Sequence, residues 1–155
     1  MTGRVLLLAL AIAALPSAAN ADSATATMAV SLKVEPACAV ATEPMVFAGQ
    51  AGSAIWADTK IAVKCSVDTP VSVTLDGGAH AQGTQRHLAG AEGMVAYDLY
   101  SDAGRSILWA PGAPRSAQAA VGATLELAAY GAIPGARTLA ATGDYRDTVV
   151  VRVDF

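Results

Sequence analysis

The chain has 155 residues, with ten Lys and Arg against thirteen Asp and Glu and a formal net charge of −3. The charges are scattered singly, so no basic stripe is present that would bind nucleic acid or anionic lipid. The length fits one domain, which at this size buries about two-thirds of its unfolded surface.

The first 21 residues have the pattern of a secretory signal peptide. Arg4 precedes an unbroken apolar run over residues 5–15, and small residues follow as far as Ala19-Asn20-Ala21. A helix of that run would cover only about half of a ~30 Å hydrocarbon core, which argues against a membrane anchor. We therefore expect cleavage after Ala21, which leaves residues 22–155 as the mature chain.

Cys38 and Cys65 are the two cysteines of the chain. Because thiols in an exported protein usually pair, a disulfide between them is predicted, and two buried free thiols are the alternative. A metal site is not favoured, since no His or further Cys lies near either thiol at ligand spacing.

The mature sequence alternates with a period of two, which is typical of strands. Residues 24–34 predict a long amphipathic strand that Pro36 ends, because proline has no N–H for a ladder. The apolar face of this strand is formed by Ala24, Ala26, Met28, Val30, Leu32 and Val34.

Further strands are predicted over residues 61–67, 71–75 and 94–100, the last with Val95, Tyr97 and Leu99 facing inward. Asp76-Gly77-Gly78 is interpreted as a hairpin turn, since glycine tolerates positive φ. Residues 106–109 are expected to pair back on the strand before them, and 111–120 to form a loop.

A strand over residues 121–130 is predicted to be broken by Gly131 to Gly135. The chain then ends in one strand from Tyr145, whose apolar parity includes Val149, Val151, Val153 and Phe155. Short strands at regular spacing with turn signals between them indicate an all-β sandwich.

Sequence motifs of hydrolases, metal sites and nucleotide-binding loops are absent. His80 and His87 lack a third ligand at known spacing and are expected on the surface or in turns. The remaining candidates are interpreted as turn, strand-face, core or edge residues rather than as an acid/base set or a sugar platform: Asp144, Asp147 and Glu126, and Trp56 and Trp109. We therefore expect a protein that is not an enzyme, without a catalytic, cofactor or metal site.

The order and spacing of several short motifs resemble the spore coat protein U (SCPU) domain family, which includes major subunits of Csu-type, archaic chaperone–usher pili. The motifs follow one another through nearly the whole mature chain: Cys38-Ala39-Val40, Ile61-Ala62-Val63-Lys64-Cys65, Leu75-Asp76-Gly77-Gly78, Arg86-His87-Leu88, Tyr97-Asp98-Leu99-Tyr100, Trp109, Tyr130-Gly131-Ala132-Ile133-Pro134, and Gly143 to Val151.

The resemblance implies an incomplete immunoglobulin-like sandwich over residues 35–155 that lacks its last strand. Residues 22–34 would be a donor strand that fills the gap of the next subunit, although insertion into the same chain is the alternative. A periplasmic chaperone would first bind the edge formed by Val149, Val151, Val153 and Phe155, and an outer-membrane usher would then exchange it for the donor strand.

Three functions remain open at this point. The first is a shaft or adaptor subunit of a surface pilus that supports adhesion and biofilm formation, which passes through the periplasm to the cell surface. The second is an exported spore-coat or matrix protein of the same fold. The third is a small secreted binding domain or hydrolase.

Overall fold

The structure is a computed structural model that describes residues 22–138 and 142–155. The predicted signal peptide lies outside these residues. The chain separates into two units, Met1–Lys33 and Val34–Phe155. In the first unit, residues 22–33 form neither helix nor strand, and their side chains are exposed.

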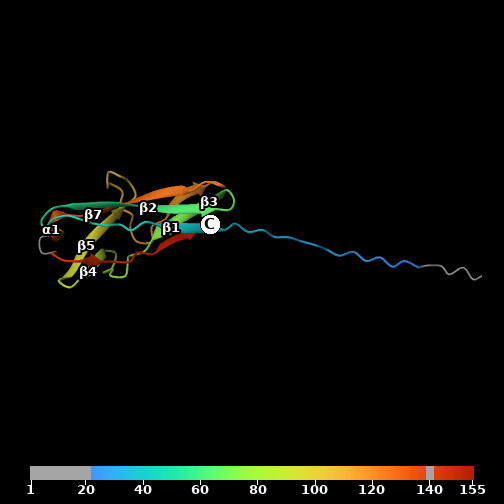
Figure 1. Cartoon of the computed structure of the whole chain (residues 1–155), viewed down its shortest axis with the longest axis horizontal. Helices are drawn as coiled ribbons and strands as arrows, with labels where there is room; N and C mark the ends of the chain where they lie inside the picture. Colours follow the sequence, from blue (N-terminus) through green and yellow to red (C-terminus); the bar gives the residue numbers. More distant parts are fainter. Residues whose placement is uncertain (1–21, 139–141) are drawn as a thin grey trace, which may run out of the picture. The chain divides into compact units, whose positions relative to one another are not determined.

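In the residues that the structure describes, the second unit consists of short strands joined by turns, with a single helical turn, α1 (Gly135–Thr138). Its described strands, several of which are labelled in Figure 1, are β1 (Cys38–Thr42), β2 (Ile55–Cys65), β3 (Thr69–Leu75), β4 (Arg86–Gly90), β5 (Gly93–Tyr100), β6 (Arg115–Ala119), β7 (Leu125–Ile133), β8 (Tyr145–Arg146) and β9 (Val151–Asp154).

Two antiparallel sheets form the layers of this unit. The larger sheet has the strand order β1-β2-β7-β5-β4-β8, and the smaller one has the order β6-β3-β9. The order places β9 at an edge of the smaller sheet, where Val73 of β3 lies opposite Val153. The unit is thus an all-β, immunoglobulin-like sandwich, and its smaller sheet ends at β9.

The core lies between the sheets and is built from the alternate residues of their strands. Its largest fully buried side chains are Ile61, Val63 and Val73. Val95, Tyr97 and Leu99 of β5 are also buried, as their parity predicted.

Several predicted boundaries are wrong. Residues 115–119 form β6, although 111–120 was expected to be a loop, because they pair with β3 along the whole of Arg115–Ala119. β7 continues to Ile133 through the glycine that was expected to end it. β2 begins already at Ile55, and Val67 lies beyond its end and is exposed.

The links between strands also differ from expectation. Asp76-Gly77-Gly78 turns the chain with φ +83° at Gly78, but it connects β3 of one sheet to β4 of the other and is therefore not a hairpin. The expected return of residues 106–109 is confirmed, since Trp109 N–H donates to the Leu99 carbonyl at 2.7 Å. The single strand predicted from Tyr145 is divided between β8 and β9, in different sheets.

Candidate functional site: an open groove beside the last strand

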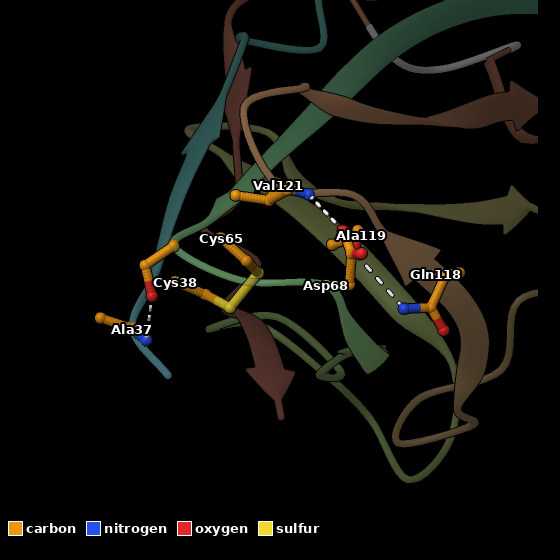
Figure 2. The surroundings of a disulfide bond; sticks show 8 residues. Ala37, Cys38, Cys65, Asp68, Gln118, Ala119 and Val121 are labelled. Carbon is orange, nitrogen blue, oxygen red and sulfur yellow. Dashed lines mark hydrogen bonds between the residues drawn. A yellow bond between two sulfur atoms is a disulfide. The ribbon is translucent and has the colours of Figure 1, made fainter. Parts of the chain in front are cut away.

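The predicted disulfide between Cys38 and Cys65 is present, and it joins β1 to β2 (Figure 2). The two residues are also direct partners in the strand register. Just beyond the bridge, Ala37 N–H donates to Ser66 Oγ at 3.0 Å. The disulfide therefore fixes the start of the sandwich domain to the edge of the larger sheet.

The sandwich contains a cavity of about 360 Å³ that opens beside its last strand. Apolar side chains from both sheets form most of it, and residues before β2 and after β8 contribute its two sides. The lining residues are Thr42, Glu43, Pro44, Met45, Phe47, Thr59, Ile61, Leu75, Leu88, Tyr97, Leu99, Ala129, Asp147, Thr148, Val149 and Val151.

A second cavity of about 650 Å³ adjoins the first and shares five lining residues with it: Met45, Phe47, Leu88, Asp147 and Thr148. Its own lining is more polar, with Asp144 and Arg146 among the residues. We call the two cavities together the groove, which runs from an apolar part near β9 to a polar part near β8.

One side of the groove is formed by the C-terminal residues, which were predicted as the edge for a partner strand. Val149, Val151 and Val153 face the core, yet each is only half-buried. Phe155 at the end of the chain is 57% exposed. Core-facing valines stay half-exposed here because no strand of the described chain covers the free edge of β9.

The opposite side is formed by residues 43–49, which follow β1 and belong to no strand. Met45 and Phe47 are half-buried against the core, and the Phe47 ring lies 5.9 Å from the Tyr97 ring between centroids. A side chain at Gly131 would collide with both Met45 and Phe47. This glycine therefore allows residues 43–49 to lie close to β7.

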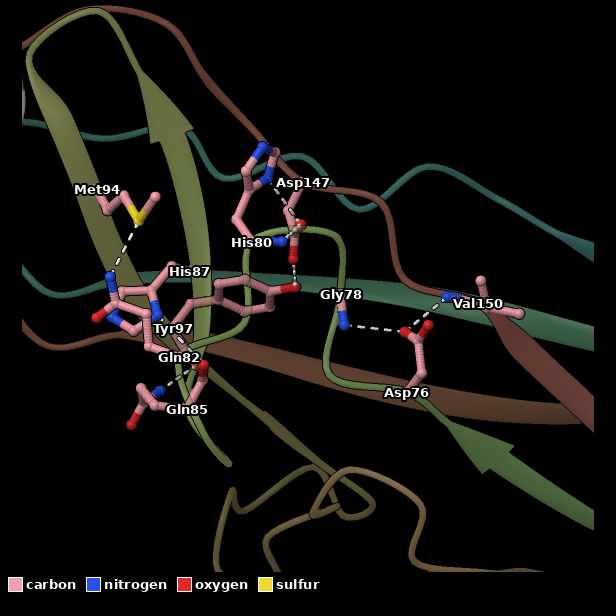
Figure 3. Close-up of polar contacts among 10 residues, drawn as sticks. All are labelled: Asp76, Gly78, His80, Gln82, Gln85, His87, Met94, Tyr97, Asp147 and Val150. Atoms are coloured by element: carbon pink, nitrogen blue, oxygen red, sulfur yellow. Dashed lines mark hydrogen bonds and ion pairs between the residues drawn. The ribbon is translucent and has the colours of Figure 1, made fainter.

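The buried carboxylate of Asp147 lines the groove, and Figure 3 shows its polar contacts. The Asp147 side chain is 3% exposed. Tyr97 Oη donates to its Oδ2 at 2.7 Å, and His80 N–H donates to its Oδ1 at 3.1 Å. The His80 ring lies at the same Oδ1, with Nδ1 at 3.1 Å.

These contacts explain the charge state of the cluster. Burial opposes ionisation of Asp147, but hydrogen bonds from Tyr97, from the Thr148 amide and from His80 outweigh it and hold the pKa of this carboxyl below its ordinary value. Burial, and then the bond to the carboxylate, raise the pKa of Tyr97, so its hydroxyl remains a donor. The groove thus contains an ionised aspartate whose partners are provided by the fold.

Sequence analysis had assigned Asp147 to turns and polar strand faces, and the structure corrects this. The residue shares the parity of Val149 and Val151, and a charged residue on an apolar parity was the signal that could have identified it. Asp144 and Glu126 are exposed, in agreement with their assignment. Among the residues that the structure describes, no cluster of His, Cys, Asp and Glu could hold a metal ion.

A buried arginine joins the two sheets next to the groove. Arg86 is 2% exposed and donates through Nε to the Asp76 carbonyl at 2.9 Å and through Nη1 to the Trp109 carbonyl at 2.8 Å. Burial lowers the pKa of its guanidinium. It provides hydrogen-bond donors to the main-chain carbonyls of Asp76, just after β3, and of Trp109. Sequence analysis had noted Arg86 only as part of a motif.

The two tryptophans have different surroundings. Trp109 is 3% exposed and belongs to the core, whereas Trp56 is 65% exposed with the Arg105 guanidinium 5.8 Å from its ring centroid. Trp109 is therefore a core residue, as interpreted, and Trp56 lies on the outer face of the larger sheet.

Residues 24–34, predicted as an amphipathic strand, have no ladder in the structure. Met28, Val30 and Leu32 are 86%, 88% and 87% exposed, and Val34 is 76% exposed. An isolated strand is not stable in water, so an alternating segment with no strand paired beside it takes no regular structure. No helix in the described residues is both long enough and apolar enough to cross a membrane.

The fold and the groove together define an immunoglobulin-like sandwich with an open edge, and comparisons with known proteins agree with that class. Residues 24–152 match the Spore Coat Protein U domain, and the chain belongs to this family. No curated protein sequence matches the chain.

A solved structure similar to this chain comes from Acinetobacter baumannii. It is the crystal structure of the CsuC–CsuE pre-assembly complex, between a chaperone and a tip adhesion subunit of archaic chaperone–usher Csu pili. The matched chain is 25% identical with a TM-score of 0.62, and the alignment covers 79% of the present chain. It covers 40% of the matched chain, so the present protein corresponds to less than half of that length.

Proposed function

We propose that this protein is a structural subunit of a surface pilus that is assembled by the chaperone–usher pathway through donor-strand exchange. The observation that carries the proposal is the open groove beside the free edge of β9, in a chain that also has an exposed, alternating apolar segment at residues 24–34. The groove has an open strand edge beside it, and the alternating segment forms no strand within its own chain.

In this proposal residues 22–34 are the donor strand and residues 35–155 are the accepting domain of a neighbouring copy or a related subunit. The inserted face is formed by Ala24, Ala26, Met28, Val30, Leu32 and Val34. Burial of the four larger side chains would contribute roughly 6–12 kcal/mol, an upper value because unfolded chains already bury some surface.

Before exchange, the groove requires protection. Exposed apolar edges pair and aggregate, so a periplasmic chaperone would cover the edge that includes Val149, Val151, Val153 and Phe155. An outer-membrane usher would then catalyse the replacement. The similarity to a chain from a chaperone–subunit complex supports this route.

Export follows from the proposed signal peptide at residues 1–21, with the periplasm as the transit compartment and the cell surface as the destination. Adhesion and biofilm formation would be properties of the fibre, and no catalytic role is proposed for the subunit. The family name supports one alternative, an exported spore-coat or matrix protein of the same fold.

Deletion of residues 22–34 tests the proposal. The mature chain and the deletion variant would each be co-expressed with a periplasmic chaperone of an archaic chaperone–usher system, purified as complexes, and mixed with the usher of that system. We expect fibres from the mature chain and none from the variant, with chaperone binding retained in both. Fibres formed by the deletion variant, or a mature chain that stays monomeric at high concentration after the chaperone is removed, would refute donor-strand exchange.

A further inference from the structure

The C-terminal side of the groove passes from one sheet to the other without a ladder of its own. β8 pairs with β4 of the larger sheet, and β9 pairs with β3 of the smaller one. Residues 147–150 connect them and belong to no strand. Part of the edge that a donor strand would pair with is therefore not held by a sheet.

Two carboxylates hold this connection to the turn between β3 and β4 (Figure 3). Asp147 accepts hydrogen bonds from Tyr97 Oη and from the His80 amide, as described above. Asp76 Oδ1 accepts from the amide of Val150 at 2.8 Å and from the amide of Gly78 at 2.9 Å.

Backbone bonds complete the attachment. Ala79 N–H donates to the Thr148 carbonyl at 3.0 Å, and Asp76 N–H donates to the Val150 carbonyl at 3.1 Å. The turn is shaped for this contact, because any side chain at Gly78 would collide with the Asp147 carboxylate. The main-chain groups that are tied to the turn are thus those of Thr148 and Val150.

The empty groove creates a physical problem for this edge. A cavity of about 360 Å³ beside half-buried valines favours collapse, since sinking Val149 and Val151 inward would remove apolar surface from water. The Asp147 carboxylate is already buried, and it cannot move inward without losing the hydrogen bonds from Tyr97 and His80, which would leave a buried charge without donors. Asp147 and Asp76 can therefore keep the connection extended while no partner occupies the groove.

We propose that Asp76 and Asp147 are positioning residues that hold residues 147–150 extended in the empty groove, so that an incoming donor strand meets a preformed pairing edge. The inference rests on the proposed function and adds to it the residues that keep the groove of the accepting subunit ready for the donor strand. In the filled groove the new ladder itself holds the edge, so the two carboxylates matter for strand entry and not for strand retention.

The test compares assembly and disassembly rates of the mature full-length chain with those of four variants. Asp147→Ala removes the carboxylate, and Tyr97→Phe removes only the hydroxyl that binds it. Glu92→Ala is the control, because Glu92 is exposed in the turn between β4 and β5 and its replacement makes the same charge change as Asp147→Ala. Assembly is started by dilution of the oxidised chain from denaturant and followed by light scattering.

We expect Asp147→Ala and Tyr97→Phe to assemble at least about tenfold more slowly, since each loses a hydrogen bond to a charged group. Their polymers should dissociate in denaturant within about twofold of the wild-type rate, and Glu92→Ala should match the wild type in both. Asp147→Asn should recover part of the assembly rate, because its amide oxygen can still accept one bond.

Equal effects on assembly and disassembly would show a merely structural role and overturn the inference, as would wild-type assembly rates in both variants. If Asp147→Ala does not fold, Tyr97→Phe decides the outcome alone. Failure of the wild-type chain to assemble at all would instead refute the proposed function, so the two failures are distinguishable.

Discussion

Truncation of one donor-strand side chain should separate assembly from folding. Leu32 is 87% exposed within its own chain, so Leu32→Ala should leave the unfolding of the isolated subunit unchanged. In a filled groove the same side chain would be buried. The substitution removes three carbon atoms, which at about 0.8 kcal/mol each weakens strand insertion by about 2.4 kcal/mol, roughly a 50-fold change in affinity.

The assay measures both quantities on the same preparations. The critical concentration for polymer formation reports insertion, and urea unfolding of the chaperone-free subunit at low concentration reports folding. Ser31→Ala is the matched control, since Ser31 lies on the opposite parity of the segment. A loss of subunit stability with unchanged assembly would show that Leu32 packs inside its own chain, and the reasoning would be refuted.

Three further changes test the groove and the disulfide. The pKa of Asp147 is depressed in the folded protein, so its stabilising contribution is complete above the unfolded pKa of about 3.9 and is lost as the pH falls through the lower folded value. The free energy of unfolding, measured with urea from pH 6 to 2, should therefore fall more steeply for the wild type than for Asp147→Asn. Parallel curves for the two proteins would contradict this. Replacement of both Cys38 and Cys65 by Ser should lower the free energy of unfolding by roughly 3–4 kcal/mol for a sequence separation of 27, and a loss below 1 kcal/mol in denaturant titration would contradict the chain-entropy argument. Gly78→Ala should lower the free energy of unfolding by about 1–3 kcal/mol, because φ is positive there and the new side chain would collide with Asp147. The loss should be smaller for Gly83→Ala, where φ is also positive but the space is open. Equal losses in thermal unfolding would contradict the role of the close contact.

Much of the sandwich could be predicted from alternation, because a side chain's parity follows from local geometry alone. The inward set of β5, the return of the chain after it, and the Cys38–Cys65 bridge are confirmed. The residues of β6 were assigned to a loop, since Arg115–Ala119 contains small and polar side chains and no β-branched or aromatic residue that would indicate a strand.

The division of the last predicted strand could not be read from sequence. Apart from Asp147 and Val150, residues alternate from Tyr145 to Val153 as one strand would, yet β8 and β9 belong to different sheets. Parity states which side faces inward, and it carries no information about which strand lies beside each residue. The same limit made the turn at Asp76 look like a hairpin.

The sequence by itself determined that this protein is all-β and that one leading segment is apolar on a single face, and it predicted the disulfide that the structure shows. Only the tertiary structure decided that β9 ends its sheet with a free edge, that a groove lies beside it, and that Asp147 is buried there between Tyr97 and His80. The physical reason is that alternation is a property of one strand, whereas an open edge and a satisfied buried charge depend on segments that are far apart in the chain.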